Sequence, residues 1–221
     1  MPRDASGKID PEELLKAYTL GYFPMARSRS DDAAMWVLPD FRGVLPLAEA
    51  RAPRRLVRTL KREIFDVRVN TAFSETISGC ARKSKGREDT WINHAIEDVY
   101  LELHRMGFAH SVETWRDGRL VGGLYGVAIG AVFCGESMFS LERDASKIAM
   151  LHLIARLKIG GFRLLDTQFF TPHLAQFGVM EYPDTDYQLM LEDCMPLKAD
   201  FFAAGPQLST ETVLQSITHT S

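Results

Sequence analysis

Residues 145–159 are apolar on nearly every side of a helix, and this feature restricts the fold more than any other stretch of the chain. A helix without a polar face is normally buried inside a protein. Apolar segments at 131–134 and 162–166 flank this run and are typical of buried strands, while Gly160-Gly161 marks the end of the helix. The order strand, helix, strand predicts a sheet with at least one helix packed on it.

The remaining chain adds helices and strands in an order typical of the mixed α/β (α+β) class. Asp10-Pro11 followed by Glu13 predicts a helix start, and Asp117-Gly118 predicts the turn of a β-hairpin. Further helices are expected at 51–64, at 72–81 and from a cap at Thr90 to Gly107, and further strands at 65–69, 110–115 and 119–129. We therefore expect a mixed sheet with helices packed on it.

The composition indicates a soluble globular protein. With 221 residues, 46% of them hydrophobic, the chain suits one domain of middling size with an N-terminal extension. No apolar run is long enough to span a bilayer, and the N-terminus lacks the apolar core of a signal peptide. Cys80, Cys134 and Cys194 are widely spaced, which favours reduced thiols over a disulfide framework or a zinc site. We expect a cytoplasmic protein that binds no metal.

Two polar clusters lie beside the predicted buried helix. Gly135–Lys147 is expected to be a strand-to-helix connection that carries Glu136, and Asp166 and Gln168 end the following strand on one face of it. Carboxylates there would orient an amine nucleophile and accept its proton, and an amide would hold a carbonyl or relay a proton. Any one of these side chains is more simply explained by strand-end hydrogen bonds, but three that converge favour a catalytic site.

A basic segment stands out in a chain whose net charge is −3. Residues 51–62 contain no acid and six bases: Arg51, Arg54, Arg55, Arg58, Lys61 and Arg62. A solvated helix face is the simpler explanation, but like charges at this spacing repel each other unless an anion binds. The segment therefore favours contact with a nucleic-acid backbone. Trp91, at the edge of a predicted helix, is equally consistent with the core and with a substrate-facing ring.

Several motifs in one order resemble the bacterial leucyl/phenylalanyl-tRNA–protein transferases over roughly residues 10–190. They are Leu14-Leu15-Lys16-Ala17-Tyr18, Gly21-Tyr22-Phe23-Pro24, Thr90-Trp91-Ile92, Ala109-His110-Ser111-Val112-Glu113, Val121-Gly122-Gly123-Leu124-Tyr125-Gly126-Val127, Gly135-Glu136-Ser137-Met138-Phe139-Ser140, Ala145-Ser146-Lys147 and Leu165-Asp166-Thr167-Gln168. The resemblance implies a GNAT-like acyltransferase domain after a small N-terminal domain. We place the N-terminal domain at 1–62, the catalytic domain at 63–195 and a loosely held tail at 196–221.

The resemblance also implies a reaction and roles for residues. The family moves Leu or Phe from aminoacyl-tRNA to the α-amine of proteins with N-terminal Arg or Lys, which marks them for degradation, and it uses no metal or coenzyme. By this resemblance Asp166 and Gln168 are the catalytic pair, and Glu136 orients the 3′-adenosine or the attacking group. Trp91 would stack on the terminal adenosine. The donor amino acid would be bound by Leu124, Leu153 and Leu165, with Met25. The tRNA would be held by Arg54, Arg55, Arg58, Lys61, Arg62 and Lys147. Met25 and Met35 stand where the family usually has Trp.

Three alternatives remain open at this stage. An acyl-CoA-dependent N-acetyltransferase would need a Gly-rich pyrophosphate loop, but Glu142-Arg143-Asp144 precedes the buried helix. A tRNA-binding protein without catalysis would keep the basic segment and have no need of Glu136, Asp166 and Gln168 together. The same chemistry with another donor or acceptor, such as Met as donor or Arg transferred to acidic N-termini, is the third. We expect a monomer.

Overall fold

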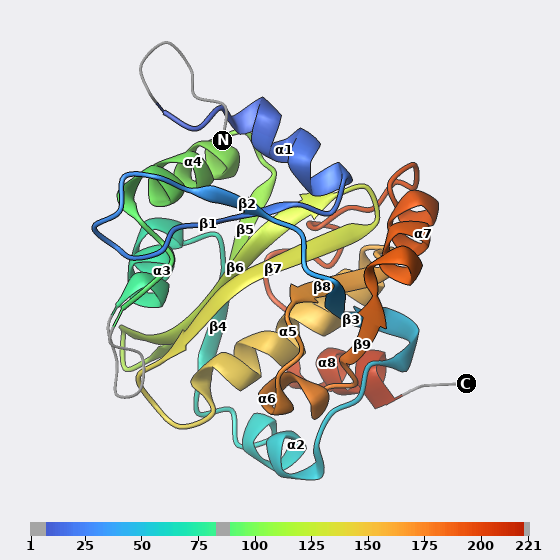
Figure 1. The fold of residues 1–221 in the computed structure, drawn as a ribbon. Helices are drawn as coiled ribbons and strands as arrows, with labels where there is room; N and C mark the ends of the chain where they lie inside the picture. Colours follow the sequence, from blue (N-terminus) through green and yellow to red (C-terminus); the bar gives the residue numbers. More distant parts are fainter. Residues whose placement is uncertain (1–7, 83–88, 219–221) are drawn as a thin grey trace.

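The computed structural model describes residues 8–82 and 89–218 (Figure 1). Within them, a seven-stranded sheet has the order β4-β5-β6-β7-β8-β3-β9, and β1 and β2 form a separate antiparallel pair. The strands are β1 (Phe23–Met25), β2 (Met35–Val37), β3 (Phe41–Pro46), β4 (Asp66–Val69), β5 (Ala109–Arg116), β6 (Arg119–Ile129), β7 (Val132–Ser140), β8 (Leu164–Gln168) and β9 (Met180–Pro183). The helices are α1 (Pro11–Thr19), α2 (Arg54–Leu60), α3 (Phe73–Ala81), α4 (His94–Arg105), α5 (Ala145–Ile159), α6 (Pro172–Ala175), α7 (Asp184–Cys194) and α8 (Thr210–Thr218), with a 3₁₀ turn at Leu47–Glu49.

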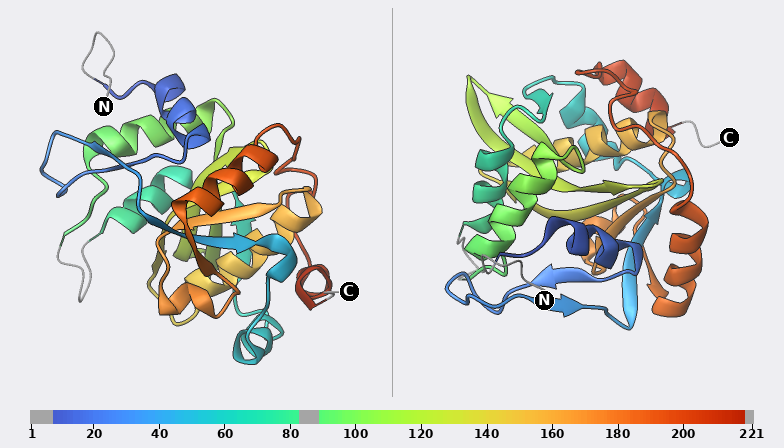
Figure 2. Two further views of the ribbon diagram at one scale, coloured as in Figure 1. Left: turned by 45° about the vertical axis from the view of Figure 1, so that its right-hand side comes forward. Right: turned by 90° about the horizontal axis from the view of Figure 1, so that it is seen from above.

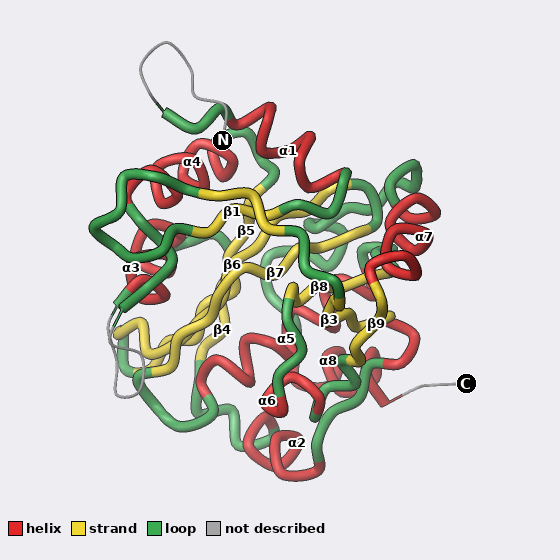
Figure 3. Tube along the Cα trace, viewed as in Figure 1, coloured by secondary structure: helices red, strands yellow, loops and turns green. Residues whose placement is uncertain are grey.

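Helices cover the large sheet on both faces, which confirms the mixed α+β class. One core cluster joins one face of the sheet to α1, α3, α4 and α7, and a second joins the opposite face to α2, α5 and α8. The second view in Figure 2 separates these layers, and the strands in Figure 3 run between the two groups of helices. No helix in the described part of the chain is long and apolar enough to cross a membrane.

The large sheet opens between β7 and β8. These two strands are parallel, whereas the other neighbouring pairs of the sheet are antiparallel. Their ladder pairs Val132–Cys134 with Leu164–Asp166 and ends there, although β7 continues to Ser140. From Gly135 onward β7 therefore has β6 as its neighbour on one side and an opening on the other. The residues that border this opening are Glu136, Thr167 and Gln168.

The predicted loop from Gly135 is wrong in its first half, because β7 extends through Ser140 and only residues 141–144 connect it to α5. The strand passes Glu136 by a β-bulge: Tyr125 pairs with Ser137 and Gly126 with Gly135, so Glu136 is the extra residue. A bulge redirects the side chain at the extra position. Gly126 permits the bulge, because a Cβ atom there would lie 2.3 Å from the carbonyl oxygen of Cys134.

Other expectations are confirmed or corrected by the described residues. Helix α1 begins as predicted, with the side chain of Asp10 accepting from the backbone N–H of Glu12 at 2.8 Å, and the 117–118 hairpin turn and α5 are also as predicted. Helix α4 is capped by Asn93 instead of Thr90, because Asn93 accepts from the N–H of Ile96. Helix α2 is shorter than the predicted 51–64.

The C-terminal segment is not loosely held, which corrects the prediction for residues 196–218. Phe201, Val213 and Ile217 are buried in the core cluster of α5, and Arg156 on α5 donates to the carbonyl oxygen of Phe201 at 3.0 Å. Apolar contacts and the buried guanidinium of Arg156 hold this segment against α5, although its sequence contains no long apolar run. The boundary that the sequence analysis places after residue 62 separates β3 from the predicted catalytic domain. In the structure β3 pairs with β8 and β9 of the large sheet.

Candidate active site

Asp166 lies near the end of β8, fully buried, and all of its acceptor positions are occupied. Its Oδ1 accepts from Arg42 Nε at 2.9 Å and from the backbone N–H of Gln168 at 2.8 Å. Its Oδ2 accepts from Arg42 Nη2 at 2.7 Å and from the hydroxyl of Tyr187 at 2.9 Å. A carboxylate with both oxygens used twice has no lone pair left for a substrate. Asp166 therefore fixes its neighbours and does not itself touch a reacting group.

Arg42 is the positively charged partner of Asp166 in a buried ion pair. Its guanidinium also donates to the carbonyl oxygen of Gly21 at 2.8 Å and lies over the rings of Phe23 and Tyr187, 4.7 and 4.6 Å from their centroids. Burial lowers the pKa of Arg42, but the carboxylate of Asp166 outweighs burial and leaves that pKa above its ordinary value. A bidentate pair of this kind fixes both side chains in one orientation.

Gln168 stands at the edge of the opening in a left-handed backbone conformation with φ of 63°. This conformation is uncommon for a residue with a side chain, and such strain is found mainly at functional sites. The hydrogen bond from its N–H to Asp166 stabilises this turn of the backbone. Its side-chain Nε2 is buried without a hydrogen-bond partner among the described residues. A buried amide donor without a partner costs free energy unless a ligand accepts its hydrogen.

Glu136 forms a cluster with two tyrosines, here called the Glu136 cluster. Its Oε1 accepts from the Tyr18 hydroxyl at 2.6 Å and its Oε2 from the Tyr100 hydroxyl at 2.7 Å. The two hydroxyl oxygens lie 2.5 Å apart. Burial raises the pKa of Glu136 to about 7, while the hydrogen bonds from both tyrosines and the nearby amide of Gln168 act in the opposite direction. Glu136 is thus the carboxyl group of the site that changes its protonation near neutral pH.

A pocket of about 390 Å³ with a mixed polar and apolar lining lies elsewhere, beside the end of α2, but the pocket at the opening between β7 and β8 is the one that Glu136 borders. This second pocket, here called the donor pocket, has a volume of about 230 Å³, several times the roughly 30 Å³ of one water molecule. Besides Glu136 and Thr167, its lining includes the apolar side chains of Leu124, Met138, Met150, Leu153, Leu165 and Leu174. The predicted pocket residues Leu124, Leu153 and Leu165 are thus brought together with Glu136.

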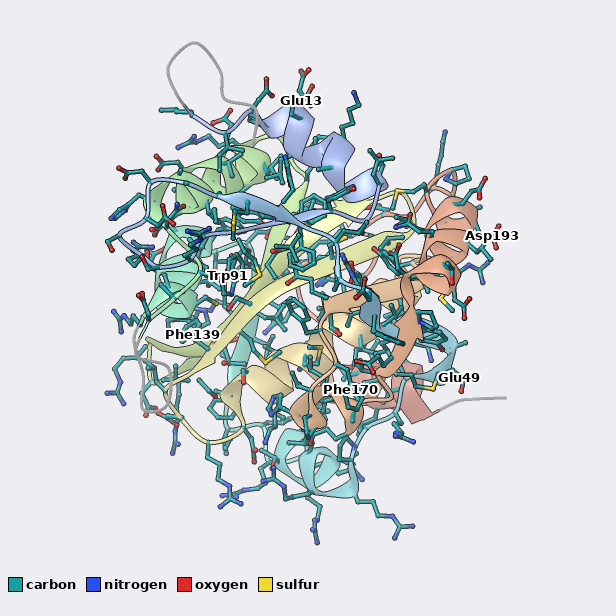
Figure 4. The ribbon with its side chains drawn as sticks, viewed as in Figure 1. Glu13, Glu49, Trp91, Phe139, Phe170 and Asp193 are labelled. Atoms are coloured by element: carbon teal, nitrogen blue, oxygen red, sulfur yellow. The ribbon has the colours of Figure 1, made fainter. Side chains whose placement is uncertain are left out.

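Trp91 and Met25 do not line the donor pocket. Both are partly buried against the core cluster of α1, α3 and α4, and the carbonyl oxygen of Trp91 accepts from the N–H of Ala26 at 3.0 Å. Figure 4 shows Trp91 beside the β1–β2 pair, apart from Phe170 on the segment that follows β8. The hydrogen bond from Ala26 brings the backbone of Trp91 next to the residue that follows Met25. The predicted contact of both side chains with a substrate stays a prediction.

The basic residues of α2 border a groove of about 540 Å³, here called the basic groove. Its cationic lining consists of Arg55, Arg58, Arg62, Arg116 and Arg143, and Glu142 and Asp144 also contribute. Arg54 and Lys61 are exposed on the same helix segment but outside this lining.

Two of these arginines are neutralised by acids within the protein. Arg55 forms two hydrogen bonds of 2.7 and 2.8 Å with Asp144, which Lys147 also approaches at 3.4 Å, and Arg116 pairs with Glu142. Asp144 occupies the N-cap position of α5 with φ of 67°, but its side chain accepts no helix N–H. Burial raises the pKa of Asp144, but Arg55 and Lys147 outweigh it and leave that pKa below its ordinary value.

No group of three or more His, Cys, Asp or Glu side chains among the described residues has the arrangement of a metal site. His110 and His152 are buried, and burial lowers the pKa of each to about 4, so both are neutral core side chains. Cys80, Cys134 and Cys194 are buried and form no disulfide among the described residues. These histidines and cysteines therefore have structural roles in the fold.

Sequence reasoning did not find four residues that hold the polar groups of the site: Tyr18, Arg42, Tyr100 and Tyr187. Arg42 carries a signal, because a charged residue in the otherwise apolar segment 41–47 is unusual for a buried strand. The tyrosines carry none, since each has the helical spacing of an ordinary core residue.

Comparison with known proteins points to one family. The family model described as leucyl/phenylalanyl-tRNA protein transferase matches residues 44–192, and the model of the N-terminal domain of the same transferases matches residues 7–40. The chain belongs to the leucyl/phenylalanyl-tRNA–protein transferase family. This finding confirms the resemblance that the motifs indicated.

Relatives of this family match nearly the whole chain. A leucyl/phenylalanyl-tRNA–protein transferase of Nitrobacter winogradskyi is 53% identical over 199 residues, covering 90% of this chain and 88% of that protein. One of Phenylobacterium zucineum is 51% identical and covers 90% of each chain, and one of Maricaulis maris is 49% identical, covering 95% of this chain and 97% of its own. Among solved structures, L-PGS from Bacillus licheniformis aligns with 76% of this chain and 56% of its own at a TM-score of 0.41 and 13% identity.

Proposed function

We propose that this aminoacyltransferase moves leucine or phenylalanine from aminoacyl-tRNA to the α-amine of proteins whose first residue is Arg or Lys, and so marks them for proteolysis. The observation that carries the proposal is the opening between β7 and β8, where a largely apolar pocket is bordered by Glu136 and the amide of Gln168 lies near that carboxyl group. An aminoacyl ester is already activated, so the enzyme has to align the amine with it and stabilise the developing charge.

The donor pocket supports an apolar donor. Its lining of Leu and Met side chains offers contacts to an aliphatic or aromatic side chain and no charged group on the face of α5. The one acidic group of the lining, Glu136, already accepts from Tyr18 and Tyr100, so an arginyl donor would bury its guanidinium among apolar side chains at a cost. Leu124, Leu153 and Leu165 therefore bind the donor side chain, and methionine is a further candidate because it is unbranched and adaptable.

The polar residues support acyl transfer at the mouth of this pocket. Gln168 Nε2 donates to the carbonyl oxygen of the ester, which becomes negative as the amine attacks. Asp166 positions Gln168 through the backbone N–H and is itself fixed by Arg42. Trp91 stacks on the terminal adenosine from the β1–β2 side, and Met25 next to it replaces a second ring with a smaller apolar surface.

The basic groove supports binding of the tRNA acceptor arm. Arg58 and Arg62 form no ion pair within the described residues, so they are available to phosphates, whereas Arg55 already pairs with Asp144. Arg54 and Lys61 extend the charged surface, and Lys147 beside Asp144 marks the side nearer to the donor pocket. The acidic partners leave the groove a positive surface suited to a polyanion.

We include in the proposal that the enzyme works as a monomer in the cytoplasm. The three buried thiols, none of which is in a disulfide within the described residues, agree with a reducing compartment. The oligomeric state is measured by sedimentation of the purified chain, and a stable dimer would contradict this part.

The central experiment measures transfer of labelled Leu, Phe, Met and Arg from charged tRNA to peptides that begin with Arg, Lys, Asp or Glu. We expect transfer of Leu and Phe to the Arg and Lys peptides. Transfer of Arg to the acidic peptides would overturn the donor and acceptor assignment, and tRNA binding without any transfer would favour a binding protein. Gln168→Ala is expected to lower transfer by about 10²- to 10³-fold, the effect of removing one donor from a developing oxyanion, with tRNA affinity retained.

A second experiment tests the charged surface formed by the basic groove and the adjoining exposed bases of the α2 segment. Replacing Arg54, Arg58 and Lys61 by Ala is expected to weaken tRNA binding and to reduce the slope of log K against log salt by about 2, since each phosphate contact contributes about 0.7 to 0.9. The matched control replaces Lys16, Lys158 and Lys198, which lie on other elements and carry the same total charge. An unchanged slope in the first variant, or equal changes in both, would contradict the assignment.

A further inference from the structure

The Glu136 cluster contains more oxygen contacts than its ionised form has hydrogens to bridge. Four oxygens, the hydroxyls of Tyr18 and Tyr100 and both carboxyl oxygens of Glu136, form three contacts of 2.5, 2.6 and 2.7 Å, and the ring closes through the carboxyl carbon. Each contact of this length needs a hydrogen between its oxygens. The hydroxyls of Tyr18 and Tyr100 supply two hydrogens, and an ionised carboxylate supplies none. The third hydrogen is present only when Glu136 is protonated, and each member then donates to the next around the ring.

This ring of contacts is therefore built to hold one additional proton. Tyr18 and Tyr100 are fully buried, and burial raises their pKa values well above the ordinary value, so neither hydroxyl loses its proton. The proton that comes and goes belongs to Glu136. When Glu136 is ionised, it still accepts two hydrogen bonds from the tyrosines. These bonds offset part of the cost of holding a negative charge in the interior.

The position of Glu136 connects this proton to the reaction. The β-bulge places Glu136 at the opening of the sheet, where it borders the donor pocket and faces the amide of Gln168. We propose that Glu136, held by Tyr18 and Tyr100, accepts the proton that the attacking α-amine loses and returns it to the departing 3′-oxygen of the tRNA. This inference rests on the proposed function and adds to it the route of the proton.

The step balances without another reactant. The amine nitrogen forms a bond to the ester carbon, and the carbonyl oxygen becomes negative beside Gln168. The ammonium group then gives one proton to Glu136, the carbonyl is restored, the bond from carbon to the 3′-oxygen breaks, and Glu136 gives the same proton to that oxygen. The products are an amide and a free 3′-hydroxyl, and the Glu136 cluster returns to its starting state. Glu136 is the catalytic residue here, and the two tyrosines are positioning residues.

The electrostatic surroundings suit this exchange. Burial raises the pKa of Glu136 to about 7, and a free α-amine titrates at about 8, so the proton passes between groups of similar affinity. The other charged group that acts on this pKa is Asp166 of β8, which raises it and is neutralised by Arg42. Tyr125 of β6 faces Glu136 as a neutral hydroxyl, and Cys134 of β7 lies nearby as a neutral thiol.

The test is the pH profile of kcat/KM for transfer to an Arg peptide, measured for the complete enzyme and its variants. Tyr18→Phe and Tyr100→Phe each remove one hydrogen bond to the ionised carboxylate, so the rise of kcat/KM with pH should move upward by about one pH unit. Glu136→Gln is expected to lower kcat by about 10² to 10⁴, the usual contribution of a general base. The α-amine contributes to the same limb in every variant and cancels in the comparison.

Tyr22→Phe is the matched control, because Tyr22 is partly exposed and is not part of the Glu136 cluster. Its pH profile should coincide with that of the unmodified enzyme. Tyrosine variants that lower the rate equally at all pH values would overturn the proposal and leave the tyrosines a structural role, and so would full activity of Glu136→Gln. An unmodified enzyme that transfers nothing would refute the proposed function. If the unmodified enzyme does transfer, but the rise of kcat/KM with pH is not shifted in the tyrosine variants, the proton route alone would be refuted.

Discussion

The buried pair of Arg42 and Asp166 allows the sharpest prediction about the stability of the site. We consider Arg42→Met, which removes the guanidinium and replaces the side chain by an unbranched apolar one. The variant loses the two hydrogen bonds to Asp166, the bond to the carbonyl oxygen of Gly21 and the stacking over Phe23 and Tyr187. The carboxylate of Asp166 then remains in the interior with only neutral donors. Its side chain has no exposed surface through which water could replace the guanidinium.

The expected loss follows from this burial. Removing one partner of a buried, hydrogen-bonded ion pair costs about 3–5 kcal/mol, because an uncompensated charge remains. For a chain of this length each kcal/mol lowers the melting temperature by about 2–4 °C, so the melting temperature should fall by about 10 °C. A surface ion pair would cost about 1 kcal/mol or less. Arg105→Met, which breaks the exposed pair with Glu102, is the matched control for that case.

The assay is urea unfolding of Arg42→Met, Asp166→Leu and the double variant. The double variant removes both charges, and apolar replacement of a whole buried pair is often close to neutral. We therefore expect it to be more stable than the two single losses predict, with a coupling energy of at least about 2 kcal/mol. A loss below 1 kcal/mol for Arg42→Met, or additive losses in the double variant, would refute the reasoning that burial makes this pair costly to break.

Three further predictions concern other parts of the molecule. Folding raises the pKa of Glu136 from 4.5 to about 7, so ionisation of this carboxyl group lowers the stability of the folded protein as pH rises through this window. In urea unfolding, Glu136→Gln should therefore increase the free energy of unfolding by up to about 3 kcal/mol at pH 8 and leave it unchanged at pH 4. Phe201→Ala should cost about 3–5 kcal/mol and the exposed neighbour Phe202→Ala less than half as much, and equal losses would contradict a packed C-terminal segment. Leu153→Ala enlarges the donor pocket and should shift the kcat/KM ratio of Phe to Leu by about tenfold, measured by competition between the two charged tRNAs, and an unchanged ratio would remove Leu153 from the pocket.

Local sequence signals predicted the scaffold well, because those elements follow from short-range chemistry. The 117–118 turn has φ values of 50° and 72°, as a type I′ hairpin requires of an Asp-Gly pair. Helix α5 has the bounds that its apolar run indicated. The convergence of Glu136 with Asp166 and Gln168 was also predictable, since the polar residues end or interrupt consecutive buried strands. The function came from the order of whole motifs.

The supporting residues were not predictable, because long-range packing assigns them. Tyr18 is separated from Glu136 by 118 positions, and Arg42 from Asp166 by 124. No local pattern tells a buried tyrosine that donates to a carboxylate from one that fills the core. The β-bulge at Glu136 depends on the pairing of β6 with β7, so a reading of β7 alone places its polar end in a loop. The C-terminal segment was missed for the same reason, since its few buried side chains meet a distant helix.

The opening in the sheet explains how one small site separates recognition from proton chemistry. Successive residues of a strand point to opposite faces, so the strands that border the opening supply apolar side chains to the α5 face and carboxyl groups to the α1 and α4 face. Leu165 contacts the donor pocket while its neighbour Asp166 pairs with Arg42 on the other side. Only a group that passes through the opening touches both faces, and an ester whose side chain occupies the donor pocket places its carbonyl there. The carboxyl groups on the α1 and α4 face thus lie outside the apolar part of the pocket. They are nevertheless close to the ester carbonyl carbon at which the new bond forms.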